Sequence, residues 1–346
     1  MNARLWTAAA AVLALSAAAA SAQDKKVRVN MQSNFASTLA VLGPTAKHVA
    51  DTIAKTSGGS IDIKFFEPGA LVPPGQAFDA VSSGSLDAAW ATPGFWTGKD
   101  IGFAVFSTVP YGPGPGEYLA WMKYGGGEKL LQKLYAKYNI HSMICNLIAP
   151  EASGWFRKEI KTVDDLRGLK MRFFGLGANV MQKLGVATQL LQAGEIFQAL
   201  QLGTIDATEF SMPAMDLSLG FHQVAKFYYF PGWHQQATFG DMIWNKAKWD
   251  QLSETQKAIA QAACDSATLM GFARSEYEQF AALQEIEKKG VKLMTWSPEF
   301  LQAFEKAWEE VAKEQAEKSP VFKEAWDSLR EFRKNYAVWR ERGYLK

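Results

Sequence analysis

The sequence predicts an α/β protein with two similar lobes, each built on a mainly parallel β-sheet flanked by helices. Two repeats predict this duplication. The pattern FxAxxxGxxDA occurs once from Phe78 and again from Phe197, and a shorter match upstream relates residues 64–70 to residues 172–178. A supersecondary unit must bury its apolar face against neighbouring elements, so two copies of one unit indicate two related lobes.

Each repeat has the pattern of a βαβ unit. In the first repeat, strands are predicted at 61–66 and 86–91; in the second, at 170–174 and 205–209. Between the two strands of each repeat lie a glycine-containing loop, a helix and a tight turn. Strands that alternate with helices usually pair in parallel. Ligands of open parallel sheets bind beyond the carboxyl ends of the strands, so two facing lobes predict a cleft lined by the loops there.

A helical pattern at 253–289 is long enough to bridge the two lobes. It opens with Ser253 and places Gln256 at position N3, which together form a capping box. The other predicted elements are an opening strand at 27–31, a helix at 39–56 that stops at two glycines, and charged amphipathic helices over 300–336.

The first 22 residues have the features of a cleaved secretory leader. Arg4 precedes an apolar run at 8–20, and Ala20, Ser21 and Ala22 fit the small-x-small cleavage rule. The run is shorter than the roughly 20 apolar residues of a membrane-spanning helix. We therefore expect export with cleavage rather than anchoring.

The charge balance argues against a nucleic-acid partner. The formal net charge is +2, and it falls to +1 once the leader, with Arg4 as its single charged residue, is removed. Such a chain has no global field to attract nucleic acid or anionic lipid.

The residues typical of zinc enzymes and serine hydrolases show no known spacing. Cys145 and Cys264 are the only cysteines, and two buried free thiols are favoured over a disulfide. The four histidines lack zinc-binding spacing, and no GxSxG elbow occurs. We therefore expect no enzyme. Two alternatives stay open: a secreted metal-dependent hydrolase with Glu209 as general base, and a periplasmic sensor subunit that presents its ligand to a receptor kinase.

Several motifs carry a family resemblance. They are the leader and the segments LRGLKMR at 166–172, GTID at 203–206, EASGWFRK at 151–158 and YYFPGW at 228–233. Together they resemble the substrate-binding subunits of tripartite ATP-independent periplasmic (TRAP) transporters. Within that family they are most similar to the branch that binds 2-oxo acids and related monocarboxylates together with a cation. The resemblance implies a periplasmic protein that hands its ligand to membrane permease subunits.

The resemblance also implies the two-lobed periplasmic binding protein fold, with hinge strands and a long lobe-spanning helix. On this basis we expect a signal peptide at 1–22 and a first lobe formed by 23–149 plus 238–277. The second lobe, together with the carboxyl-terminal helices, is expected to comprise 150–237 plus 278–346.

Arg172 is the first candidate for ligand binding. It ends a predicted strand, where a planar guanidinium can meet a carboxylate through two parallel hydrogen bonds. The family resemblance implies the same role. It further implies a calcium or sodium ion held by the Glu209 side chain, the Phe210 carbonyl and Gln235, so that the cation and Arg172 hold one acid together.

Glu151 bears on the charge of the ligand. An acid at this position would repel a second carboxylate, which favours a monocarboxylate such as pyruvate or lactate over a dicarboxylate. Whether Glu151 contacts the ligand or the ion stays open. Two nearby carboxylates suit a divalent ion better than a monovalent one, which favours calcium.

Aromatic residues are the candidates for the apolar walls of the pocket. Trp96 and Trp233 each follow a Pro-Gly pair, and Phe66 precedes a glycine loop; all three are predicted to shape the site. The carboxyl-terminal helix carries Trp339 and other apolar anchors on a charged segment. The resemblance implies a homodimer formed by exchange of this helix, and the alternative is a helix packed on its own body.

Overall fold

The computed structural model describes residues 24–345. The predicted leader at 1–22 lies outside the described residues. Within 24–345, none of the helices combines the length and apolar character needed to cross a bilayer.

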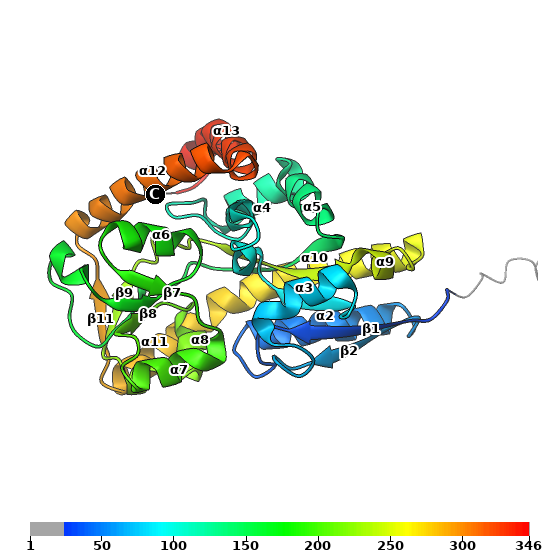
Figure 1. Ribbon diagram of the computed structural model, residues 1–346, viewed down its shortest axis with the longest axis horizontal. Helices are drawn as coiled ribbons and strands as arrows, with labels where there is room; N and C mark the ends of the chain where they lie inside the picture. The colour runs from blue at the N-terminus through cyan, green and yellow to red at the C-terminus, as the bar shows by residue number, and fades with distance from the viewer. Residues whose placement is uncertain (1–23, 346) are drawn as a thin grey trace, which may run out of the picture.

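Two β-sheets form the centres of two lobes (Figure 1). The first sheet has the order β2-β1-β3-β10-β4, with β1 (Val27–Ser33), β2 (Ile61–Phe66), β3 (Ala88–Ala91), β4 (Ile140–Ile148) and β10 (Thr238–Asn245). The second has the order β11-β9-β5-β8-β6-β7, with β5 (Gly154–Phe156), β6 (Lys170–Arg172), β7 (Ala187–Gln189), β8 (Ala207–Thr208), β9 (Phe227–Phe230) and β11 (Lys292–Thr295). The predicted two-lobed α/β fold is confirmed.

Both sheets are mixed. Strands β1, β2 and β3 pair in parallel in one sheet, as do β6, β7 and β8 in the other. Antiparallel pairing arises where the chain passes from one lobe to the other. The chain leaves the first sheet along β4 and enters the second along β5, and it later leaves the second along β9 and re-enters the first along β10. Strand β4 therefore pairs with β10, and β5 pairs with β9, in antiparallel fashion. The sequence pattern predicted the parallel units, but it carried no signal for this crossing.

The two sequence repeats occupy equivalent places in the two lobes. In the first, helix α3 (Ala77–Ser83) ends at Gly84, which adopts a left-handed φ of 84°, and β3 follows. The side chain of Asp87 then accepts a hydrogen bond of 2.8 Å from the backbone N–H of Asn30 in β1. In the second, Asp206 accepts one of 2.9 Å from the N–H of Lys170 in β6. The repeated aspartate thus joins each returning strand to its parallel neighbour.

Helices cover the outer faces of the sheets. They are α2 (Leu42–Thr56), α4 (Pro115–Tyr124), α5 (Gly127–Ala136), α6 (Gly175–Lys183), α7 (Ala193–Gln201), α8 (Pro213–Ser218) and α9 (Lys246–Trp249), with short 3-10 turns that include Pro93–Trp96 and Ile101–Phe106.

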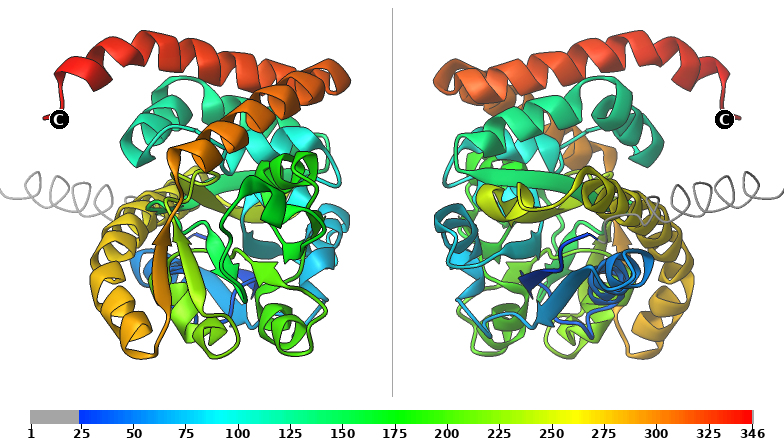
Figure 2. Two further views of the ribbon diagram at one scale, coloured as in Figure 1. Left: turned by 90° about the vertical axis from the view of Figure 1, so that its left-hand side faces the viewer. Right: turned by 90° about the vertical axis from the view of Figure 1, so that its right-hand side faces the viewer.

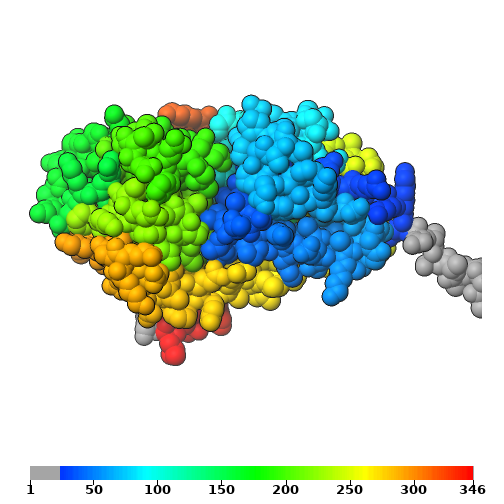
Figure 3. Space-filling model, turned by 90° about the horizontal axis from the view of Figure 1, so that it is seen from below, coloured from blue at the N-terminus to red at the C-terminus, as the bar shows by residue number. Residues whose placement is uncertain are grey.

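The predicted lobe-spanning helix is two helices in series, α10 (Glu254–Tyr277) and α11 (Gln279–Lys288). Its capping box is confirmed: the Ser253 hydroxyl accepts from the N–H of Gln256 at 3.1 Å, and Oε1 of Gln256 accepts from the N–H of Ser253 at 3.0 Å. Helix α10 packs on β4 and α2 of the first lobe, and α11 packs on α8 of the second. The pair runs along one edge of both lobes, the lower edge in the view of Figure 3.

The carboxyl-terminal region is also divided, into α12 (Pro298–Lys318) and α13 (Pro320–Arg342). Pro320 has no backbone N–H and disfavours helical geometry at the residue before it, so the helix stops at Ser319 and restarts. Helix α12 packs on α6, and α13 crosses over α4, α5 and the turn at Ile101–Phe106 (Figure 2). The lobe boundaries given above stay a prediction.

Cys145 and Cys264 form a disulfide that joins β4 to α10. The expectation of two free thiols was wrong. Both cysteines are fully buried, as expected, but their separation of 119 residues gave no sign that a sheet strand and the spanning helix place them side by side.

Candidate functional site

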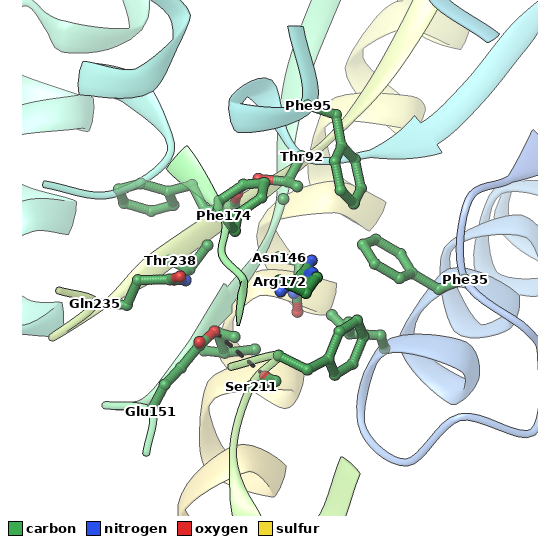
Figure 4. Close-up of a pocket in the computed structure, with 15 residues that line it drawn as sticks. Phe35, Thr92, Phe95, Asn146, Glu151, Arg172, Phe174, Ser211, Gln235 and Thr238 are labelled. Atoms are coloured by element: carbon green, nitrogen blue, oxygen red, sulfur yellow. Dashed lines mark hydrogen bonds between the residues drawn. The ribbon is translucent and has the colours of Figure 1, made fainter. Parts of the chain in front are cut away.

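A small cavity lies between the two lobes, at the carboxyl ends of β1, β3, β6 and β8 (Figure 4). Its volume is about 40 Å³, a few times the roughly 10–15 Å³ that one buried water requires. This is where the strand pattern predicted a cleft. The lining residues are Phe35, Leu42, Thr92, Phe95, Asn146, Ile148, Glu151, Arg172, Phe174, Phe210, Ser211, Gln235, Thr238, Phe239 and Gly240.

Arg172 ends β6 and points into this cavity, with 1% of its surface exposed. Its Nη1 donates to the backbone carbonyl and to Oε1 of Glu209, both at 2.7 Å, and its Nε donates to the Leu191 carbonyl at 3.3 Å. Among residues 24–345 its Nη2 has no hydrogen-bond partner. The protein therefore occupies one edge of the guanidinium and leaves one terminal nitrogen for a ligand.

Glu209 follows β8 and is fully buried. Its Oε1 accepts from Arg172 and also from the backbone N–H of Phe174 at 2.5 Å. Burial alone would raise the pKa of Glu209, but Arg172, His234 and the Phe174 N–H together lower it below its ordinary value. Glu209 is thus held as a carboxylate, and its Oε2 has no hydrogen-bond partner in the described chain.

Glu151 also faces the cavity, and its electrostatics are opposite to those of Glu209. Burial raises its pKa well above the usual range, and the nearby carboxylates of Glu209 and Asp216 raise it further. Its Oε1 accepts from the Ser211 hydroxyl at 3.2 Å, whereas Oε2 has no partner among residues 24–345. A cation beside Glu151 would compensate this buried acid.

Gln235 supplies a third oxygen. Its Nε2 donates to the Thr238 hydroxyl at 2.8 Å, which leaves its buried Oε1 without a partner in the part of the chain that the structure describes. Unpartnered oxygens of Glu151 and Gln235 therefore face one cavity. Glu209 does not line the cavity, but its carboxylate lies within 4.8 Å of that of Glu151. Hard oxygen ligands of this kind suit calcium or sodium, so the donor set fits the predicted cation.

His234 was missed by the sequence reasoning. The ligand atoms of Glu151, Glu209 and His234 all lie within 4.8 Å of one another. The imidazole is buried, its Nε2 lies 3.5 Å from Glu209 Oε2, and neither ring nitrogen has a hydrogen-bond partner among residues 24–345. His234 lies between Trp233 and Gln235, which were both predicted to belong to the site, and this position was the signal that could have identified it.

Phe210, predicted to offer its carbonyl to the ion, lines the cavity. Its ring centroid lies 5.3 Å from Cζ of Arg172, a cation–π contact. A ligand role for its carbonyl stays a prediction.

The three predicted wall residues do not line the cavity. Trp96 is buried against Phe78, with ring centroids 5.3 Å apart, and Trp233 stacks on Phe304 at 4.6 Å. Phe66 is only partly buried, with Lys64 Nζ 4.9 Å from its ring centroid.

Phenylalanines form the apolar wall instead: Phe35, Phe95, Phe174, Phe210 and Phe239. Phe95 is the neighbour of Trp96, so the sequence located the loop but not the residue that faces the cleft. That choice depends on the 3-10 turn at Pro93–Trp96, which turns Trp96 toward the core. Asn146 also lines the cavity, which no sequence motif indicated; its Oδ1 is buried without a partner in the described residues.

Comparison with known proteins identifies the family to which this fold belongs. The model of the bacterial extracellular solute-binding protein family 7 (DctP) matches residues 32–319. The chain belongs to this family. A family 7 relative from Nostoc sp., a monocarboxylate 2-oxoacid-binding periplasmic protein, is 36% identical over 294 residues, which cover 85% of this chain and 81% of the relative.

Solved structures of TRAP transporter solute-binding proteins resemble this family 7 chain throughout. A protein from Bordetella bronchiseptica RB50, a mixed-occupancy dimer with copurified calcium and picolinate, has a TM-score of 0.89 at 32% identity and covers 91% of this chain and 94% of its own. One from Pseudoalteromonas atlantica T6c, with bound sodium and pyruvate, has a TM-score of 0.88 at 30% identity and covers 91% and 96%. Both of these solved structures are solute-binding proteins with a bound cation and a small bound carboxylate.

Proposed function

We propose that this chain is the periplasmic receptor of a TRAP transporter, exported with its leader removed. It captures a small monocarboxylate, a 2-oxo acid or 2-hydroxy acid such as pyruvate or lactate, together with a cation. It then delivers the acid to the membrane permease subunits.

The observation that carries this proposal is a cavity of about 40 Å³ lined by Arg172, Glu151 and Gln235, each with a side-chain atom that has no partner among residues 24–345. The carboxylate of Glu209 lies behind this lining, within 4.8 Å of that of Glu151. A cation held by Glu151, Glu209 and Gln235 would accept oxygens from the acid on one side. Arg172 Nη2 would donate to the carboxylate on the other. Calcium is favoured over sodium because two buried carboxylates attract a divalent ion more strongly.

The charge of the lining favours one carboxylate per ligand. Arg172 is the only cationic side chain among the lining residues, and Glu151 adds an acid. A second carboxylate would lie in a buried site with no second cation from the protein, and an unpaired buried charge is costly.

Closure of the lobes supports delivery to a permease. The cavity is lined from both lobes, so a bound acid and cation stabilise the closed form over the open one. A permease that prefers the closed form then distinguishes loaded from empty receptor, because only a difference in affinity shifts such an equilibrium.

A homodimer through the carboxyl-terminal helix is part of this proposal. Helix α13 buries Phe322 and Leu329 within its own chain, while Val338 and Trp339 near its end are 59% and 56% exposed. This exposed end is the part of the helix left for a second copy, and the relative from Bordetella bronchiseptica is a dimer.

Calorimetry on protein stripped of metal tests the function. Pyruvate is titrated with calcium, with sodium and with neither, and succinate serves as the dicarboxylate control. We expect pyruvate binding that requires a cation and is tightest with calcium, and succinate binding weaker by roughly 100-fold. If neither 2-oxo nor 2-hydroxy monocarboxylates bind under any of these conditions, the proposal is wrong.

A further inference from the structure

The cavity has two chemically different sides (Figure 4). Glu151, Ser211 and Gln235 form a polar side below and beside Arg172. Phe35 and Phe95 lie on the opposite side. An acid of the form R–CO–COO⁻ or R–CHOH–COO⁻ matches this division, since both oxygen groups are at one end and the chain R is at the other.

Phe95 reaches the cavity from the first lobe, on the turn that follows β3. Its ring lies edge-to-face with Phe174 at a centroid distance of 5.3 Å and tilted against Phe35 at 5.8 Å. Phe174 belongs to the second lobe, two residues beyond Arg172. Phe95 is therefore the ring that crosses between the lobes and closes the apolar side.

The neighbouring backbone holds this arrangement tightly. A Cβ on Gly94 would lie 2.2 Å from the ring of Phe174, so only glycine allows the turn to approach so closely. The turn that carries Phe95 therefore packs directly on Phe174.

We propose that Phe95 sets the length of the acid: its ring limits R to about the size of a methyl or ethyl group. The inference rests on the proposed function, because the oxygen end of the acid must be held at Arg172 and the cation for R to face the ring. With that end fixed, a longer or branched R meets Phe95 before the lobes can close. In an apolar pocket, one methylene too many or too few changes discrimination by about 10- to 200-fold.

The test compares three acids in the presence of calcium: pyruvate, 2-oxobutyrate and the branched 2-oxo-4-methylpentanoate. Calorimetry measures their affinity for wild-type protein and for Phe95→Ala and Phe95→Leu. Phe66→Ala is the matched control, since it removes the same side chain from the same lobe but away from the cavity. Thermal unfolding of each variant checks that it is folded.

We expect wild type and Phe66→Ala to bind pyruvate at least 10-fold more tightly than the branched acid. In Phe95→Ala the order reverses, because removal of the ring makes room for the branched chain and removes a contact that favours closure. Phe95→Leu lies between the two. A mere loosening of the fold would weaken all three acids together and leave their order unchanged.

Two results overturn the inference while the proposed function stands: an unchanged order of affinities in both Phe95 variants, or wild-type protein that binds the branched acid as tightly as pyruvate. Wild-type protein that binds none of these acids overturns the proposed function, and the inference with it.

Discussion

At the scale of single residues, the site is a balance of buried charges. Arg172 and Glu209 form an ion pair at 2.7 Å with side chains that are 2% and 0% exposed. Such a pair is costly to desolvate and is retained where its atoms have another task. Here the pair leaves Nη2 of Arg172 at the cavity, and it leaves Oε2 of Glu209 without a partner among residues 24–345 and close to the cavity-lining Glu151, so one interaction orients both candidate binding groups.

We expect Arg172→Met to abolish measurable acid binding and to lower the free energy of unfolding by about 3–5 kcal/mol, because Glu209 would lose its buried partner. Arg172→Lys keeps the charge but not the planar fork, so its affinity for pyruvate should fall by roughly 10- to 100-fold. Calorimetry with calcium and urea unfolding measure both effects.

Arg167→Met is the control for this pair of variants. Arg167 lies five residues earlier, is 71% exposed and pairs with exposed Asp164, so binding and stability should match wild type. Pyruvate affinity that is unchanged in both Arg172 variants would show that the guanidinium is not the clamp.

At the scale of elements, the two lobes are tied together by few connections. Strands β4 and β10 pair along their whole length in the first sheet and lead to and from the second. Helix α10 packs against β4 on the outer face, and the Cys145–Cys264 disulfide fixes that contact. The crossing strands and the spanning helix thus form one joined unit, against which the second lobe would close in the mechanism that we propose.

Removal of the disulfide by Cys145→Ala with Cys264→Ala should lower the free energy of unfolding by about 2–4 kcal/mol, because the bond restricts the unfolded chain across 119 residues. Urea unfolding with and without reductant measures the effect. The reductant should lower the stability of wild type and leave the double variant unchanged. Two titratable thiols in unreduced, denatured wild-type protein would contradict the disulfide.

At the scale of the whole molecule, stability depends on acids that folding buries without a cation. Asp241 lies on β10 in the interior of the first sheet and is fully buried. Burial raises its pKa from 3.8 to about 7, although hydrogen bonds from Tyr135 at 2.6 Å and Ser142 at 3.2 Å act in the opposite direction. The folded protein therefore keeps a proton on Asp241 at pH values where the unfolded chain has released it.

This difference predicts a pH-dependent contribution to folding. Because the folded-state pKa is raised, the contribution of Asp241 is fully present below about pH 4 and is lost as the pH rises toward 7. The slope is about 1.4 kcal/mol per pH unit. Urea unfolding between pH 4 and 8 should show the stability of wild type falling relative to Asp241→Asn, by up to roughly 4 kcal/mol.

Asp79→Asn serves as the control, since Asp79 is exposed and pairs with Lys99 on the surface. Its unfolding free energy should run parallel to that of wild type over the whole pH range. If the curve of Asp241→Asn is also parallel to wild type, Asp241 titrates alike in the folded and unfolded chain.

The sequence alone determined the class of fold, the duplicated βαβ unit and the region of the site. These are local signals: strand and helix periodicity, glycines at turns, and polar residues placed directly after strands, such as Arg172 and Glu209. It also located Gln235 and Glu151 from their motifs. Arg172 and Glu209 lie close together because they end or follow β6 and β8, two neighbouring parallel strands. Glu151 and Gln235 lie on the segments that cross between the lobes, and the binding roles of all four stay a prediction.

Only the tertiary structure decided which side chains meet. The ion pair of Arg172 with Glu209, the disulfide between β4 and α10, and the approach of His234 to two acids all join segments far apart in sequence. The choice of Phe95 over Trp96 as a wall residue depended on a single 3-10 turn. Periodicity specifies which face of an element is apolar, but the packing of two lobes specifies which of those apolar residues face a ligand.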